Sequence, residues 1–126
     1  MVNMEITLAG TLMWRNMELA RFVIEDDNPI EFVPLREKGK YWPFYMTDEC
    51  DGWALIDTLK DRVVPPTRQG LIPKLRAIGI DGYDISAILE YQNASAFGDR
   101  HWVRFDGRGP QTWEELLKKI GYTVVF

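Results

Sequence analysis

Residues 63–105 read VVPPTRQGLIPKLRAIGIDGYDISAILEYQNASAFGDRHWVRF, and the rest of the chain is expected to pack around them. Pro73 is tolerated in the first turn of a helix, where its missing N–H costs nothing, so a short helix is expected to begin near Leu71. Asp84 is a suitable N-cap for a second short helix. The aromatic segment His101–Phe105 has the alternation of a strand. The stretch therefore predicts two short amphipathic helices followed by a buried strand.

Three strands are expected before this stretch. They are Met4–Trp14, Met17–Ile24 and Ile30–Leu35, in which apolar and polar residues alternate. Arg15 and Asn16 fit a tight turn between the first two strands, because Asn tolerates a positive φ. The acidic residues 25–29 form the next loop. Pro34 cannot donate to a sheet ladder, which favours an edge position for the third strand. This pattern predicts an antiparallel meander.

Two further helices are expected on either side of residues 63–105. Thr47 is the predicted N-cap of a helix over Asp48–Arg62, with Trp53 on its buried stripe. Thr112 and Glu115 have the spacing of a capping box, which predicts a last helix. The residues of that helix expected to face inward are Leu116, Leu117 and Ile120, and Tyr122–Phe126 is expected to add an edge strand.

The sequence thus predicts an α+β fold. A small antiparallel N-terminal sheet packs against three to four short helices, with a later strand near residues 101–105. Residues 1–126 are expected to form a single globular domain. The hydrophobic fraction is 46% and the charged fraction 27%, so a chain of this length can bury a core without disulfides.

Composition argues against several classes of function. The formal net charge is −4, which disfavours non-specific binding to nucleic acid, since that requires clustered Lys and Arg. Cys50 is the single cysteine, so an internal disulfide is excluded and a reducing, cytoplasmic location is expected. The N-terminal MVNMEITLAG does not have the pattern of a signal peptide, and no apolar run approaches the roughly 20 residues of a membrane-spanning helix.

Cys50 and His101 are the only residues that could form a thiol–imidazole pair. A helix N-terminus would favour the Cys50 thiolate, but the three carboxylates around it oppose that effect, and Cys50 is expected to be an incidental small residue. His101 alone cannot build a zinc site. No catalytic residue, cofactor or metal ion is therefore expected.

Aromatic residues give the clearest sign of a binding surface. They make up 13% of the chain. Four of them lie in the irregular segment 36–46, and these are Tyr41, Trp42, Phe44 and Tyr45. So much aromatic area in a loop must either cover the core or contact a partner. Trp102 is expected on the opposite face of its strand from Val103 and Phe105, and we expect it to be buried under another element rather than to contact a partner.

Four segments of the chain carry a resemblance. They are LMWRNMELARFVIEDDNPIEF (12–32), RVVPPTRQGLIPKLRAIGI (62–80), SAFGDRHWVRF (95–105) and TWEELLKKIGY (112–122). In this order they resemble the N-terminal region of HipA-like kinase proteins found in Firmicutes. Arg68 falls in the segment that matches the family's Ser/Thr–Arg–X–Gly pattern. Asp99, His101 and Trp102 match fixed places of its leucine–serine–X–aspartate–X–tyrosine–tryptophan pattern, with His101 in place of the tyrosine and Gly98 in place of the serine.

The resemblance implies a free-standing accessory module rather than a kinase. In such proteins this region precedes a kinase domain, whereas this sequence has no histidine–arginine–aspartate loop, no aspartate–phenylalanine–glycine motif and no Gly-rich loop. Some toxin–antitoxin systems place such a module on a small protein that restrains the kinase. The expected function is therefore a non-enzymatic interaction module, either an antitoxin-like or inhibitory partner of a bacterial HipA-like kinase or a mobile-element regulator. The expected partner-binding residues are Tyr41, Trp42, Phe44, Tyr45, Arg68, Asp99, His101 and Trp102.

Two other classes of function remain as alternatives. One is a small enzyme that uses Cys50 or His101. The other is a DNA-associated regulator that reads DNA with the short helix in RQGLIPKLRAIG, residues 68–79.

Overall fold

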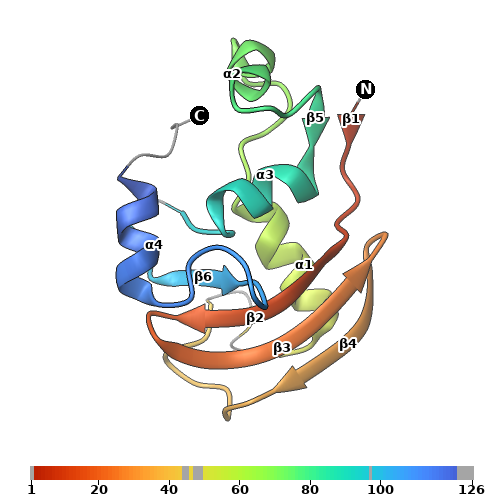
Figure 1. Ribbon diagram of the computed structural model, residues 1–126. Coiled ribbons are helices and arrows are strands. Elements are labelled where there is room, and N and C mark those ends of the chain that lie inside the picture. The colour runs from red at the N-terminus through yellow and green to blue at the C-terminus, as the bar shows by residue number, and fades with distance from the viewer. Residues whose placement is uncertain (1, 44–45, 47–49, 97, 122–126) are drawn as a thin grey trace.

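The computed structural model describes residues 2–43, 46, 50–96 and 98–121, and it has an α+β fold (Figure 1). Its strands are β1 (Val2–Asn3), β2 (Leu8–Trp14), β3 (Met17–Glu25), β4 (Asn28–Pro34), β5 (Tyr83–Asp84) and β6 (His101–Arg104). Its helices are α1 (Gly52–Asp61), α2 (Leu71–Ala77), α3 (Ile85–Gln92) and α4 (Trp113–Ile120). Within the described residues, an antiparallel four-stranded sheet has the order β4-β3-β2-β6, and a small parallel sheet joins β1 to β5.

The predicted meander is confirmed, with two tight turns. Trp14 pairs with Met17, so Arg15 and Asn16 form the whole β2–β3 connection. Arg15, rather than Asn16, has the positive φ of 50°. Between β3 and β4 the turn is shorter than the predicted acidic loop: Asp26 and Asp27 alone connect the strands, with φ of 48° and 62°. A two-residue turn with both residues at positive φ has a backbone twist that matches the twist of the two strands it joins.

The first long strand begins at Leu8 instead of Met4. The backbone just before it bonds elsewhere: the Ile6 N–H donates to the Asp27 carboxylate at 2.7 Å, and the Thr7 N–H donates to the Ser86 hydroxyl at 2.9 Å. These partners lie in the β3–β4 turn and in α3. The alternation of apolar residues before Leu8 therefore reflects burial of Ile6 and not membership of the sheet.

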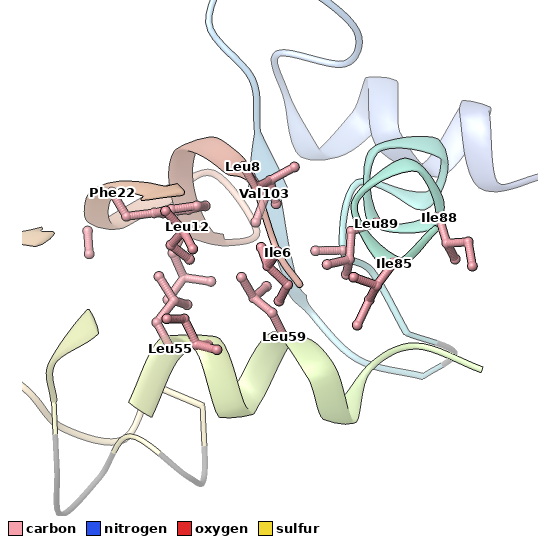
Figure 2. Close-up of a cluster of buried hydrophobic side chains, with 14 of the residues drawn as sticks. Ile6, Leu8, Leu12, Phe22, Leu55, Leu59, Ile85, Ile88, Leu89 and Val103 are labelled. Carbon is pink, nitrogen blue, oxygen red and sulfur yellow. The ribbon is translucent and has the colours of Figure 1, made fainter. Parts of the chain in front are cut away.

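The main core lies between the sheet and the two helices α1 and α3 (Figure 2). Figure 2 shows Leu55 and Leu59 of α1 below Leu12 and Phe22 of the sheet, with Leu89 of α3 closing the side. Even-numbered residues of β2 and, from Ala20 onward, of β3 face this core, because successive residues of a strand face opposite sides. Leu19 also lies in the core, at the point where the β2–β3 register shifts.

A second, smaller core lies on the opposite face of the sheet. It contains Met13, Trp102 and Leu116, with Trp113 packed against them. Trp102 is 0% exposed and lies under α4, so its predicted burial under another element is confirmed. Val103, its neighbour in β6, faces the main core. The predicted division of this strand into two faces is therefore confirmed.

Helix α1 begins later than predicted. Asp51 is its N-cap and accepts from the Ala54 N–H at 2.8 Å, so Cys50 precedes the helix. The predicted start at Thr47 and Asp48 lies outside the described residues. A Cβ at Gly52 would lie 2.4 Å from the Cβ of Pro29, so the lack of a side chain there allows α1 to approach β4.

The prediction that Trp53 is a core residue is wrong, because its side chain is 59% exposed. The buried stripe runs through Leu55, Ile56 and Leu59, and Leu59 follows the other two by four and three residues. Trp53 stands two positions before Leu55, about 200° around the helix, and so points away from the sheet.

The predicted cap of α4 is confirmed. Thr112 accepts from the Glu115 N–H at 3.2 Å, while Glu115 accepts from the Gln111 N–H rather than from that of Thr112. Of the three residues predicted to face inward, Leu116 alone is buried; Leu117 is 50% and Ile120 is 40% exposed. The helix packs on the second core through Leu116, with Trp113 beside it. The predicted strand Tyr122–Phe126 lies outside the described residues.

Replacing Thr112 with alanine should lower the free energy of unfolding by about 1 kcal/mol, because the N-cap hydrogen bond is lost. Thermal unfolding followed by circular dichroism measures the change. Thr112→Ser keeps the hydroxyl and is the matched control. An alanine variant that melts with the wild type would show that α4 does not belong to the cooperative unit.

Candidate functional site

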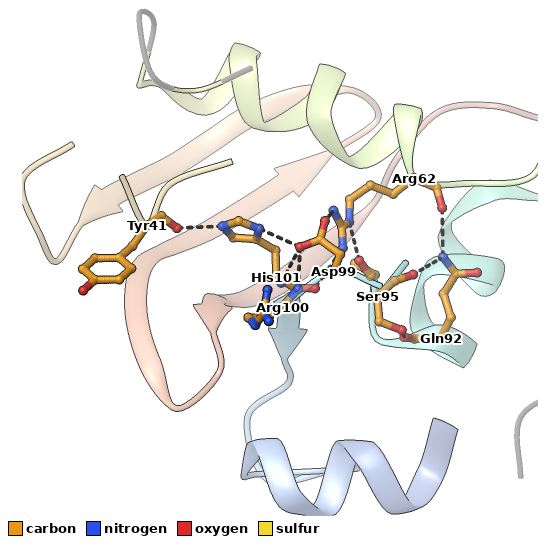
Figure 3. A network of polar contacts seen from close by, with 8 residues as sticks. Tyr41, Arg62, Gln92, Ser95, Asp99, Arg100 and His101 are labelled. Carbon is orange, nitrogen blue, oxygen red and sulfur yellow. Dashed lines mark hydrogen bonds and ion pairs between the residues drawn. The ribbon is translucent and has the colours of Figure 1, made fainter. Parts of the chain in front are cut away.

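Arg62 joins three segments of the chain at the C-terminal end of α1 (Figure 3). Its guanidinium donates to the Ala94 carbonyl at 2.6 Å and to the His101 carbonyl at 2.8 Å, and its Nη1 lies 2.5 Å from a carboxylate oxygen of Asp99. The Arg62 side chain is 11% exposed. A charge this well buried is stable only when it is paired and hydrogen-bonded, and here both conditions hold.

Asp99 is the acceptor at the centre of this network. Besides Arg62, it accepts from the backbone N–H groups of Arg100 and His101 at 2.5 and 2.9 Å. Burial alone would raise the pKa of the Asp99 carboxyl, but the hydrogen bonds from Arg62 and His101 and the charge of Arg62 hold that pKa well below its ordinary value. Asp99 is therefore a carboxylate wherever the protein is folded near neutral pH.

His101 extends the network to Tyr41. Its Nδ1 lies 2.9 Å from the Asp99 carboxylate and its Nε2 lies 2.6 Å from the Tyr41 carbonyl oxygen (Figure 3). Both oxygens can only accept, so both contacts are hydrogen bonds when each ring nitrogen carries a proton. This contact joins residues that are 60 positions apart in the sequence, and it fixes the position of the Tyr41 backbone.

Asn93 completes the support of β6 on the side away from β2. Its carbonyl accepts from the Val103 N–H at 2.8 Å, and its side-chain Nδ2 donates to the Val103 carbonyl at 3.0 Å. Asn93 and Ala94 have φ of 52° and 51°, the left-handed conformation that Asn tolerates best. The ammonium group of Lys119 in α4 donates to the side-chain oxygen Oδ1 of Asn93 at 2.5 Å.

A group of aromatic and cationic side chains lies next to this network, and we call it the aromatic patch: Trp14, Arg15, Lys40 and Tyr41. The Trp14 and Tyr41 rings are both half-buried, with centroids 4.7 Å apart at an angle of 55°. The Arg15 guanidinium lies 5.1 Å from the centroid of the Trp14 ring, and the Lys40 ammonium lies 5.0 Å from that of Tyr41. Each ring therefore has a cation over one face.

The patch is held rigidly from both sides. Arg15 donates its N–H to the Arg100 carbonyl at 2.9 Å and accepts from the Trp102 indole N–H at 2.7 Å. These two bonds hold Arg15 at its positive φ, which is uncommon for a residue other than Gly or Asn. Tyr41 is held through the His101 bond. The backbone of Arg15 and of Tyr41 is therefore fixed before binding, which lowers the conformational entropy that these residues lose when a partner binds.

The structure brings three of the predicted partner-binding residues together: Tyr41, Asp99 and His101. Asp99 and His101 support the patch rather than form its outer surface. Arg68 is exposed next to α2, which lies at the other end of the molecule from the β2–β3 turn (Figure 1). The predictions for Phe44 and Tyr45 fall outside the described residues.

Trp42 and Trp102 are interior residues, which corrects their assignment to a partner-binding surface. Trp42 is 3% exposed and its indole N–H donates to the Glu37 carbonyl at 2.9 Å, so the segment folds back over its own ring. Trp102 is covered by α4. Each indole N–H donates to a backbone carbonyl, since a buried Trp usually has a hydrogen-bond partner.

Trp14, which is half-buried, and Arg15, which is exposed, belong to the patch although their strand-and-turn pattern does not indicate a binding role for them. Trp14 ends a predicted strand and Arg15 begins a predicted turn, so both were assigned structural roles. A Trp–Arg pair at the tip of a hairpin is itself a signal, since these two residue types are enriched where partners bind. Their neighbour Tyr41 is recognised as part of the same surface only once the fold is known.

The described residues do not form a thiol–imidazole pair. Both ring nitrogens of His101 are bonded to Asp99 and Tyr41. Burial is the main cause that raises the pKa of the Cys50 thiol; Asp51 raises it further and Lys38 opposes the change. Within the same part of the chain, no group of three or more His, Cys, Asp or Glu side chains is placed to hold a metal ion.

None of the helices in the described part of the chain has both the length and the apolar character needed to cross a bilayer. Comparison of the chain with protein-family models, with curated proteins and with solved structures finds no match.

Proposed function

We propose that this protein is a non-enzymatic interaction module that regulates a protein partner by binding it through the aromatic patch. The observation that carries the proposal is the pair of half-buried rings, Trp14 and Tyr41, each with a cation over one face and both held in place from behind. Tyr, Trp and Arg are the residues most enriched in the energetically dominant part of protein interfaces. Rigid aromatic anchors also lose little entropy on binding.

The proposed partner is a bacterial HipA-like kinase, with this protein in an antitoxin-like or inhibitory role in the cytoplasm. Support comes from the resemblance of four segments to the N-terminal region of that family. Asp99, His101 and Trp102, which match the fixed places of one segment, are the residues that hold Tyr41 and Arg15. A mobile-element regulator would use the same surface for a different protein.

The alternatives have less support. An enzyme using Cys50 or His101 would need an activated thiol and a base in contact with it. The His101 nitrogens are already bonded, and the Cys50 pKa is raised. A DNA reader would use α2, a helix of seven residues with Lys74 and Arg76 near its end, which is short for insertion into a major groove.

Replacing Trp14 or Tyr41 with alanine should weaken binding to a purified HipA-like kinase from the same genome by about 2 kcal/mol each. That is roughly thirtyfold in Kd. Isothermal titration calorimetry gives the affinity, and phosphorylation assays show whether the kinase is inhibited. Each variant is checked by circular dichroism at the working temperature.

Trp53→Ala is the matched control, because Trp53 is 59% exposed on α1 outside the patch. It should bind like the wild type. If the wild type binds the kinase and the Trp14 and Tyr41 variants bind equally well, the patch is not the interface. If the wild type neither binds nor inhibits the kinase, the proposed partner is wrong.

A further inference from the structure

The charge around the aromatic patch has the opposite sign to that of the whole chain. The chain carries a formal net charge of −4. Five exposed cations nevertheless lie on the segments that form or border the patch, and these are Arg15, Arg36, Lys38, Lys40 and Arg100. Arg100 adjoins the β2–β3 turn through its carbonyl bond to Arg15, and the Arg36 side chain donates to the Glu18 carbonyl at the start of β3.

Four carboxylates of the described residues lie in the same neighbourhood. Glu18 forms an ion pair with Arg104, on the outer face of the sheet. Glu114 accepts from the Asn16 side chain at 3.3 Å, and Glu37 is exposed on the segment before Tyr41. Asp99 is already paired with Arg62. In the part of the chain that the structure describes, the five exposed cations therefore outnumber these carboxylates. Arg15 and Lys40 are the two cations that lie over the aromatic rings.

We propose that the partner presents an acidic segment to the patch, in which carboxylates on either side of an apolar side chain bind Arg15 and Lys40. This inference rests on the proposed function and names the chemistry of its partner. The Arg15 guanidinium lies over the Trp14 ring, and its planar set of N–H donors suits a carboxylate. Trp14 and Tyr41, which are half-buried against the main core, then use their remaining accessible surface to pack against the apolar side chain between the carboxylates.

Nucleic acid, the other class of polyanion, fits the patch less well. Sequence-tolerant binding of single strands depends on bases that stack on open aromatic faces. Here one face of each ring is covered by a cation, and the two rings are tilted against each other. A carboxylate can bind these cations while they stay over the rings, whereas a base that stacked on the same faces would have to displace them.

Selection from a random dodecapeptide phage library on the immobilised full chain tests the inference. Selections are run in parallel on the wild type, on the double variant Trp14→Ala/Tyr41→Ala and on the charge-reversed variant Arg15→Glu/Lys40→Glu. The matched control is Lys74→Glu/Arg76→Glu, which reverses two exposed cations on α2. A selected peptide is then synthesised, and its association rate is measured by surface plasmon resonance at two salt concentrations.

The expected consensus has two or more Asp or Glu residues beside a Leu or an aromatic residue. The alanine double variant and the charge-reversed variant should not enrich it, while the α2 control should. Association of the peptide should slow by about tenfold in the charge-reversed variant, and rising salt should slow the wild type in the same direction.

Enrichment of neutral or basic peptides that still depend on Trp14 and Tyr41 would overturn the acidic partner and leave the interaction module intact. If the alanine double variant enriches the same peptides as the wild type, the proposal that the aromatic patch is the interface is wrong. Fluorescence anisotropy with a labelled single-stranded oligonucleotide covers the remaining class. Binding at about 0.15 M salt that is lost in the charge-reversed variant would replace the acidic segment with nucleic acid.

Discussion

Replacement of Trp102 with alanine should lower the free energy of unfolding by about 3–5 kcal/mol, enough to unfold much of a marginally stable domain. The side chain is 0% exposed and lies between Met13 of β2 and Leu116 of α4. Its removal leaves a cavity between the sheet and the helix, and the Arg15 carbonyl loses the indole N–H that binds it. Urea unfolding followed by circular dichroism gives the midpoint and the slope.

Two variants separate the contributions to this loss. Trp53→Ala removes an indole that is 59% exposed and should stay within about 0.5 kcal/mol of the wild type. Trp102→Phe keeps most of the apolar area but removes the N–H donor, and it should lie between the alanine variant and the wild type. A Trp102→Ala midpoint equal to that of the wild type would show that α4 does not pack on this residue.

Replacement of Arg62 with alanine should cost about 3 kcal/mol, the lower end of the loss for a broken buried ion pair. The lower end applies because the Asp99 side chain, the partner left behind, is 32% exposed and can regain some water. Two backbone carbonyls, those of Ala94 and His101, also lose their donor. Chemical denaturation measures the difference.

The matched control is Arg21→Ala, which breaks the exposed pair with Asp106. That pair has an N–O distance of 3.0 Å and side chains that are 48% and 66% exposed. Exposed pairs contribute about 0–1 kcal/mol, so Arg21→Ala should be close to the wild type. Equal losses for Arg62→Ala and Arg21→Ala would contradict the network as the element that ties α1 to β6.

The Asp99 carboxylate also predicts how stability depends on pH. Its pKa in the folded protein is lowered from the ordinary value of 3.8, so the unfolded chain takes up its proton first as the solution is acidified. The contribution of Asp99 is therefore complete at neutral pH and is lost as the pH falls below 3.8. Asp99→Asn should be less stable at neutral pH and should lose less stability on acidification. Parallel acid-unfolding curves for the two proteins would refute this.

Much of the fold could be predicted because local signals and tertiary packing agree. The three N-terminal strands, the caps at Asp84 and Thr112 and the division of faces in β6 follow from alternation, turn residues and capping. The predictions are wrong where contacts with distant residues determine which side chains are buried. Trp53 has a helical spacing that suits a buried stripe, but the close approach of Gly52 to Pro29 turns a different face of α1 toward the sheet.

The candidate site could be predicted only in part. Tyr41, Asp99 and His101 were expected on a binding surface. They come together through the contact between His101 and the Tyr41 carbonyl, whose residues are 60 positions apart in the sequence. Trp14 was not expected there, because a Trp at the end of a strand looks the same in sequence whether it faces a core or a solvent-exposed loop. Local patterns cannot decide which side of a ring is covered when the cover comes from a distant segment.

Asn93 and Arg62 occupy the outer side of β6, and this has a consequence for how the protein behaves at high concentration. A bare strand edge is a template for pairing with another chain, which leads to strand exchange and fibrils. Here the Val103 N–H and carbonyl and the His101 carbonyl are already bonded to side chains and loop backbone. At the opposite edge, β4 contains two prolines and a register shift at Ile30, features that discourage strand addition. Both edge strands, β4 and β6, therefore disfavour the addition of a strand from another chain. A partner would be recognised through side chains and not through backbone pairing.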